Sequence, residues 1–238
     1  MKKTIFLTVI TAVLAISFAA AQDVDKILDA HFKAIGQKNL LKTNTLKATG
    51  KAMIMGMESP FTMYSKRPDK IRVVVEFQGS QIIQGYDGET AWMINPMMGS
   101  SSAVEISGPE ADGIIESADK DGLLWKYKEK GHQVELEGTE EVNGRQAYVL
   151  KMTKKNGNIA RYYIDKENYL MPRMTTQTEM NGMPVDVDVQ ISDYREVGGF
   201  KMPFNTDQRI GGQSMTNFII GNVEINMDLE DSLFSKPD

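Results

Sequence analysis

Few residues of this chain have the types and spacing that catalysis requires. The 238 residues include no cysteine and only two histidines, His31 and His132, and no nucleophile-elbow motif surrounds any serine. Asp186 and Asp188 lie two apart on an expected strand, so their carboxylates share one face. A calcium site is conceivable there, but without an EF-hand pattern the spacing favours a solvated strand face. With no glycine-rich phosphate loop and no zinc spacing, we expect no enzyme, no metal site and no cofactor.

Methionine is the unusual residue type, with sixteen copies. Met53, Met55 and Met57 alternate along one expected strand and therefore share a face. Such side chains can fill an ordinary core, or they can form a soft wall that repacks around flexible acyl chains. A copper site is a third option, disfavoured because the sulfurs are spread over separate strands without a nearby histidine. Further methionines in neighbouring strands or loops are Met63, Met93, Met97 and Met98.

Arg67 is the charged residue with the most specific setting. It stands in the turn signal Lys66-Arg67-Pro68-Asp69, where the proline favours an extended conformation for the arginine. Arg67 is either a surface charge at a turn, or a fork of five donors at a strand end that can reach the carbonyls of a covering helix.

The elements around Arg67 read as consecutive antiparallel strands. Period-two alternation predicts strands at 46–56 and 59–66, followed by strands at 71–77 and 81–86. An Asp87-Gly88 hairpin signal leads to a short strand with Trp92 that Pro96 closes. Seven more strands are expected at 133–142, 145–154, 158–165, 170–180, 183–194, 200–210 and 213–225. Five of the six gaps between them hold a turn signal, which is Asn143-Gly144, Asn156-Gly157, Asn181-Gly182, Gly198-Gly199 or Gly211-Gly212.

About a dozen strands are more than a flat sheet tolerates, so we expect a strongly curved antiparallel sheet. An amphipathic helix is predicted at 23–38. Within the interruption at 97–131, a helix at 109–118 and a second short one at 122–127 are predicted to cover a face of the sheet. Apolar residues available for that cover are Ile114, Ile115, Leu123, Leu124 and Trp125.

The N-terminus predicts export. Lys2-Lys3, the apolar run from Ile5 to Phe18 and Ala19-Ala20-Ala21 have the order of a cleaved signal peptide, residues 1–21. The run is shorter than the ~20 residues of a membrane span. Cleavage removes two lysines, which takes the net charge from −5 to −7 and argues against nucleic acid and anionic membrane surfaces as partners. We expect a soluble periplasmic product in which residues 22–238 form one domain.

Two motifs in series carry a family resemblance. Lys66-Arg67-Pro68, a run of strands and then Asp87-Gly88-x-x-x-Trp92-x-x-Asn95-Pro96 resemble the LolA-type periplasmic lipoprotein carriers and their LolB-like relatives. The resemblance is clearest over residues 23–96 and returns in Asp231-Ser232-Leu233-Phe234-x-x-Pro237. It implies a mainly β fold, in which the curved sheet forms an unclosed barrel covered by helices.

The resemblance also implies a function. The chain would be a soluble, monomeric carrier that takes lipoprotein acyl chains or lipid from an inner-membrane ATP-driven exporter to an outer-membrane acceptor. Arg67 would tie the barrel mouth to a helical lid, and Trp92 would line or support the cavity. The other candidate cavity or lid residues are Met53, Met55, Met93, Ile114, Ile115 and Leu124.

Two alternatives remain at this point. One is a periplasmic sensor or carrier of another lipid or amphiphile with the same fold. The other is an exported hydrolase with an unrecognised site, which would require a carboxylate or histidine cluster in the cavity, and the sequence shows no sign of one.

Overall fold

A computed structural model describes residues 23–54, 56–180 and 183–237. The predicted signal peptide, the Asn181-Gly182 turn signal and Met55 lie outside these ranges.

The described chain is built on one antiparallel sheet of thirteen strands, where the alternating pattern predicted about a dozen. The spatial order is β6-β5-β4-β3-β2-β1-β13-β12-β11-β10-β9-β8-β7. The N-terminal half comprises β1 (Thr45–Ile54), β2 (Met57–Lys66), β3 (Lys70–Phe77), β4 (Ser80–Tyr86), β5 (Ala91–Asn95) and β6 (Ser100–Glu105). The C-terminal half comprises β7 (Gln133–Val142), β8 (Arg145–Thr153), β9 (Ile159–Asp165), β10 (Arg173–Met180), β11 (Met183–Val197), β12 (Phe200–Ile210) and β13 (Gln213–Ile225).

The two halves meet at one seam, where β1 pairs with β13 and Leu46 lies opposite Ile225. Every other pair joins strands that follow one another in the chain. The sheet ends at β6 and β7, each with one strand neighbour in the described ranges, so the curved sheet is not closed. The expected fold class, a mainly β unclosed barrel with few helices, is confirmed.

Tight turns produce this order. Asn143 and Gly144 adopt φ of 53° and 78° between β7 and β8, and Gly211 and Gly212 adopt 57° and 81° between β12 and β13. Two successive left-handed residues are the requirement of the type I′ hairpin, so both turn predictions are confirmed. The Asn156-Gly157 turn differs, because only Gly157 has a positive φ, of 89°.

The N-terminal helix covers the end of the sheet that β7 to β9 form. Residues 23–35 are helical, and Gly36 at φ 72° separates them from a short helix, α2 (Gln37–Leu40). Val24 and Leu28 are buried in one cluster with Leu150 and Ile164 of the sheet. The predicted amphipathic helix is therefore present, broken one turn before its expected end.

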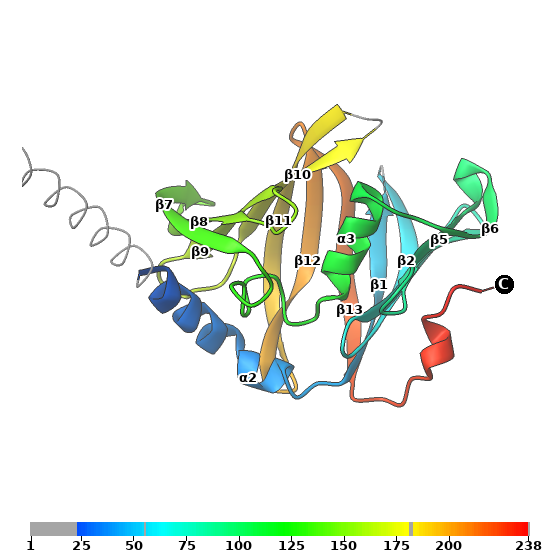
Figure 1. Ribbon diagram of the computed structural model, residues 1–238, viewed down its shortest axis with the longest axis horizontal. Coiled ribbons are helices and arrows are strands. Elements are labelled where there is room, and N and C mark those ends of the chain that lie inside the picture. Colours follow the sequence, from blue (N-terminus) through cyan, green and yellow to red (C-terminus); the bar gives the residue numbers. More distant parts are fainter. Residues whose placement is uncertain (1–22, 55, 181–182, 238) are drawn as a thin grey trace, which may run out of the picture.

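Helix α3 (Pro109–Ala118) has the predicted bounds and lies over the middle of the sheet in Figure 1. Its apolar face, with Ile114, packs on Ile71 and Tyr86 of the N-terminal half. On its other side, Glu116 accepts hydrogen bonds from Lys154 Nζ at 2.7 and 2.8 Å, and Lys154 lies in the β8–β9 turn. The helix therefore spans the two halves, apolar on one side and ionic on the other.

Two predictions for the interruption at 97–131 were wrong. The segment 122–127 forms turns instead of a helix, because Lys126 adopts φ 53°, a left-handed conformation that an α-helix excludes. Residues Ser100–Glu105, expected to lie outside the sheet, form the edge strand β6. A short 3-10 helix, η1 (Pro96–Met98), connects it to β5.

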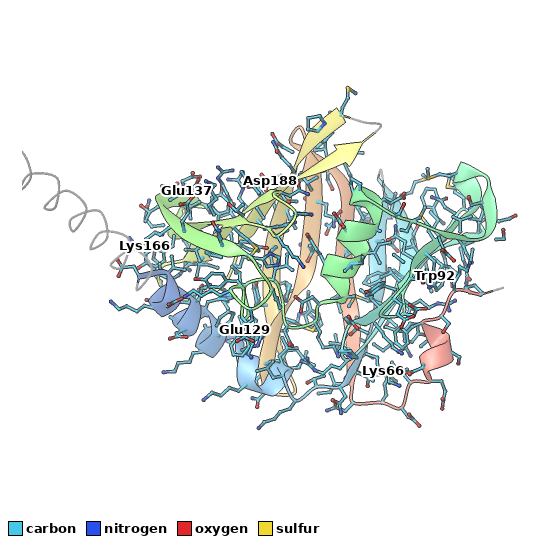
Figure 2. The ribbon with its side chains drawn as sticks, in the orientation of Figure 1. Lys66, Trp92, Glu129, Glu137, Lys166 and Asp188 are labelled. Carbon is cyan, nitrogen blue, oxygen red and sulfur yellow. The ribbon has the colours of Figure 1, made fainter. Side chains whose placement is uncertain are left out.

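The C-terminal segment runs along the side of the N-terminal half opposite α3. It contains a 3-10 helix, η2 (Asp231–Leu233), and the fully buried Phe234. Lys66 and Lys70 both form ion pairs with Asp231, at 2.7 and 3.0 Å. Figure 2 shows Lys66 and Trp92 on the side of the molecule where this segment lies.

Candidate ligand-binding hollow

The concave face of the sheet and helix α3 enclose a hollow of about 650 Å³. Its volume falls within the ~300–1,000 Å³ of small-molecule sites, and its wall is mostly apolar, as in such sites. We call this the main hollow. Its wall consists of Ile54, Phe61, Met63, Ile71, Val73, Val75, Ile82, Gln84, Glu110, Gly113, Ile114, Ser117, Met202, Pro203, Thr206, Gln208, Thr216, Phe218 and Ile220.

Strand alternation explains why this wall is apolar. On β3, Ile71, Val73 and Val75 point into the main hollow, whereas Arg72 between them points to the other face and donates to the Leu233 carbonyl at 2.9 Å. The polar side chains of the wall are scattered amides and hydroxyls. Glu110 of α3 is the one carboxylate among the described lining residues.

A second hollow of about 330 Å³ adjoins the first and shares Met63, Ile71 and Met202 with it. It lies beneath the N-terminal helix, with Phe32, Leu124 and other apolar side chains in its wall. The two spaces adjoin under both helical covers, and the second also has charged side chains in its wall, among them Asp119, Lys120 and Asp121.

Arg67 closes the end of the sheet next to the second hollow. Its Nε donates to the Thr43 carbonyl at 2.9 Å, and its Nη2 donates to the Leu40 carbonyl at 3.0 Å and to Asp121 Oδ1 at 2.6 Å. Leu40 ends α2, and Asp121 follows α3. One guanidinium therefore connects the end of β2 to both helical covers, through the fork geometry of arginine.

Lys120 lies beside this junction and donates to the Asn44 carbonyl at 3.0 Å. Burial and, to a smaller extent, the Arg67 charge lower the pKa of its ammonium to about 8, and Asp121 opposes both effects. Gln37 is also buried here, donating from Nε2 to the Asp121 carbonyl at 3.0 Å, while its Oε1 has no protein partner among the described residues.

The structure brings some of the predicted site residues to this region. Ile114 lines the main hollow and Leu124 the second. Met93 is buried on the same face of the sheet, where its sulfur accepts from Nε2 of the lining residue Gln84 at 3.9 Å. Arg67 lies at the closed end, as described above.

Other predicted site residues lie elsewhere. Ile115 points away from the main hollow and is exposed. Met53 is the strand neighbour of Ile54, which lines the main hollow, and neighbouring strand residues point to opposite faces. Met53 therefore points to the convex face of β1 and does not reach the hollow. Met63 and Met202 are the methionines that do line it.

Trp92 also points to the convex face. It is fully buried under the C-terminal segment, with its Nε1–H donating to the Phe234 carbonyl at 2.8 Å and Arg72 stacked 5.5 Å from its ring. Trp92 thus does not line the hollow; it holds the C-terminal segment against the back of the wall.

Sequence reasoning missed the contribution of the C-terminal strands. Met202 and Phe218 lie across the seam from β1 and β2 and complete the wall. Alternation in 200–210 and 213–225 was visible, but the β1–β13 pairing that brings these strands to the hollow left no local signal.

The two histidines and Asp188 make structural contacts, whereas Asp186 is exposed. His31 is buried, with Nδ1 at 2.7 Å from the Tyr169 carbonyl, and burial lowers the pKa of its imidazole. His132 Nδ1 accepts from the Lys155 amide at 2.9 Å. Asp188 accepts two-pronged hydrogen bonds from Arg173 at 2.8 to 3.1 Å.

Within the described ranges, no group of three or more His, Asp or Glu side chains could hold a metal ion. The helices of those ranges are all too short or too polar to span a bilayer.

No family model matches the sequence, and no curated protein matches it. Solved structures do resemble the fold. A DUF1329 family protein from Desulfovibrio piger aligns with a TM-score of 0.62 and 16% identity over 88% of this chain and 97% of that one. A putative outer membrane lipoprotein-sorting protein domain from Vibrio parahaemolyticus aligns with a TM-score of 0.59 and 15% identity, over 85% of this chain and 95% of that one. A LolA superfamily protein from Nitrosomonas europaea aligns with a TM-score of 0.55 and 14% identity, over 85% of this chain and 98% of that one.

Proposed function

We propose that this chain, whose fold is LolA-like, is an exported, non-enzymatic carrier that binds the acyl chains of lipoproteins or lipids in the main hollow. It would deliver them through the periplasm to the outer membrane. The observation that carries the proposal is the apolar hollow of about 650 Å³ between the concave face and α3.

The chemistry of the wall supports an acyl ligand. Transfer of an alkyl chain from water to an apolar site contributes about 0.8 kcal/mol per CH₂. A wall of branched aliphatic side chains, phenylalanines and the flexible Met63 and Met202 offers that environment without fixing a ligand shape. The polar side chains of the wall, which are Glu110 and scattered amides and hydroxyls, are outnumbered by the apolar ones.

The contacts of α3 with the two halves of the sheet support reversible entry of an acyl chain. Its contact with the N-terminal half is apolar, through Ile114, whereas its contact with the C-terminal half is polar, through the Glu116–Lys154 pair and the Asn156–Asp112 hydrogen bond. An ion pair can be broken and remade without exposing apolar surface, so the helix can lift on that side while its apolar side stays packed.

A matched pair of variants tests the proposal. Ile114→Asp puts a carboxylate into the main hollow, whereas Ile115→Asp puts one on the exposed side of the same helix. An apolar fluorescent probe should bind the native protein and be displaced by acylated peptides. Ile114→Asp should weaken that binding at least about tenfold, because an unpaired charge in an apolar site is costly.

Ile115→Asp should leave the probe affinity within about twofold. Circular dichroism of both variants checks that each is folded. Equal affinities for the two folded variants, or no saturable binding by the native protein, would refute the proposed function. Native mass spectrometry of the protein from its own periplasm then identifies the cargo.

A further inference from the structure

The two ends of the sheet differ in chemistry. Because neighbouring strands are antiparallel, the β1–β2, β3–β4, β5–β6, β8–β9, β10–β11 and β12–β13 turns all lie at one end. The β8–β9 turn differs from the other five, since it packs against α3 through the Lys154–Glu116 ion pair and the Asn156–Asp112 hydrogen bond. Figure 1 shows this end opposite α2 and the C-terminal segment. We define the open end by the described residues of the other five turns, 56–58, 77–80, 95–102, 183–184 and 210–213.

The open end is almost free of charge. Its described turn residues include one charged side chain, Glu58, which pairs with Lys51 at 2.8 Å. The β8–β9 turn beside it adds Lys154, which is paired with Glu116 of α3, and Lys155. At the opposite end, the turn 66–70 alone has four charged side chains, and Asp87 and Glu89 add two more in the next turn. The contrast is between a surface mostly of uncharged Gln, Ser, Asn and Gly and a heavily ionised one.

Exposed methionines occupy the tips of the open end. Met57, Met97, Met98 and Met183 are 43%, 56%, 72% and 65% exposed. Single exposed apolar side chains are ordinary. Here, however, four of the seven large apolar side chains exposed in the described ranges lie on three separate turns at one end. Their common location is what requires an explanation.

The type of partner follows from the charge and the spacing. The methionines stand on separate hairpins with uncharged polar residues between them, so they suit a broad surface better than the groove of a peptide. The methionines require an apolar layer, and the uncharged polar residues between them suit a polar layer without net charge above it. A zwitterionic bilayer has both layers. The chain's net charge of −5 disfavours an anionic surface.

The main hollow reaches the same end. Ile54, the last residue of β1, and Thr216, near the start of β13, belong to its wall. The opposite end is closed by the hydrogen bonds of Arg67. A bilayer at the open end would therefore adjoin the open side of the hollow.

We propose that the open end docks on a zwitterionic lipid surface, with Met57, Met97, Met98 and Met183 inserted among the headgroups. The flexible, unbranched side chains suit insertion into a disordered interface. The inference rests on the proposed function, since docking there would let an acyl chain pass between bilayer and hollow without crossing water.

Flotation with phosphatidylcholine vesicles tests the docking. The native protein should float with the vesicles, and phosphatidylglycerol added to them should reduce the bound fraction. The triple variant Met97→Ser, Met98→Ser, Met183→Ser should bind at least about tenfold more weakly, since three apolar contacts are lost. The matched control, Val104→Ser with Ile219→Ser, removes exposed apolar side chains away from the turns and should bind within about twofold of the native protein.

Three outcomes would overturn the docking: no flotation of the native protein, equal loss in the control, or undiminished binding by the triple variant. A protein partner that requires these methionines while vesicles do not bind would also overturn it. Probe binding without vesicles keeps the two proposals separate. A folded triple variant that binds the probe but never a vesicle leaves the carrier standing, whereas a native protein that binds no probe refutes the carrier.

Discussion

The indole of Trp92 and the backbone carbonyl of Phe234 are joined by a 2.8 Å hydrogen bond across 142 residues of sequence. Both groups are fully buried on the convex face of the N-terminal half. The contact connects the two stretches that carry the family resemblance, so their shared role is to hold the C-terminal segment on the back of the wall.

Phe234→Ala should therefore reduce stability strongly. Removing a fully buried phenylalanine costs about 3–5 kcal/mol of unfolding free energy. Urea denaturation measures the loss, and exposed Met98→Ala, expected within about 0.5 kcal/mol of the native protein, is the control. Probe affinity of the folded protein should persist, because Phe234 faces away from the main hollow; a small stability loss would show that the segment is not held tightly.

Two glycine substitutions should act in opposite directions. A Cβ at Gly85 would lie 2.4 Å from the Trp92 ring, so Gly85→Ala must displace the indole and should cost about 1–3 kcal/mol. A Cβ at Gly113 of α3 meets nothing within 4 Å, so Gly113→Ala should stabilise the helix by about 0.5–1 kcal/mol. Thermal unfolding compares them, with tryptophan fluorescence reporting the displaced indole. Equal melting temperatures for the two variants would contradict both the clash expected at Gly85 and the open space expected at Gly113.

Arg67→Leu should impair cargo handover more than folding. Lost hydrogen bonds to a charged group cost about 1.5–3 kcal/mol, and each kcal/mol lowers the melting temperature by about 2–4 °C. Probe binding should remain, while transfer of a bound lipid to outer-membrane vesicles slows. Arg161→Leu removes a surface pair with Glu137 and serves as control. If the folded Arg67→Leu protein transferred lipid at the native rate, Arg67 would have no role in cargo handover.

Lys120 should make stability rise with pH. Its pKa is about 8 in the folded protein and returns towards the ordinary 10.5 on unfolding. Between these values the unfolded chain binds more protons, so raising the pH through this window increases the unfolding free energy. Below pH 8 both states are protonated and the cost of burying the charge is constant.

Urea denaturation at several pH values measures this effect. Lys120→Met should remove the rise between pH 8 and 10.5, whereas Lys42→Met, at an exposed lysine, should retain it. If the unfolding free energy of the Lys120→Met protein rose equally between pH 8 and 10.5, a group other than Lys120 would cause the rise.

Local chemistry made most of the sheet predictable. Strands β7, β12 and β13 have their predicted bounds because Gly-Gly and Asn-Gly pairs mark their ends and each pair can adopt two left-handed residues. The resemblance to LolA-type proteins is confirmed for the fold.

The face of each strand was less predictable. Alternation shows that Trp92 and Met93 lie on opposite faces, but which face is concave depends on α3 and the C-terminal segment, both distant in sequence. For the same reason Met53 was placed in the cavity, where Ile54 lies. The helix expected at 122–127 failed differently, because the left-handed Lys126 leaves no signature in residue type.

The seam between β1 and β13 has a consequence for the order of folding. Each half of the sheet grows by hairpins between neighbouring strands, with little loop to close, but Leu46 and Ile225 are about 180 residues apart. The N-terminal strands emerge first, whether from the ribosome or during export, so β1 is available long before its second partner. Until β13 emerges, the N-terminal half exposes β1 as a bare strand edge with apolar Ala52 and Ile54, open to pairing with another chain. The nascent protein is thus most prone to aggregate just before its last strand appears, when a chaperone that shields strand edges would have the greatest effect on yield.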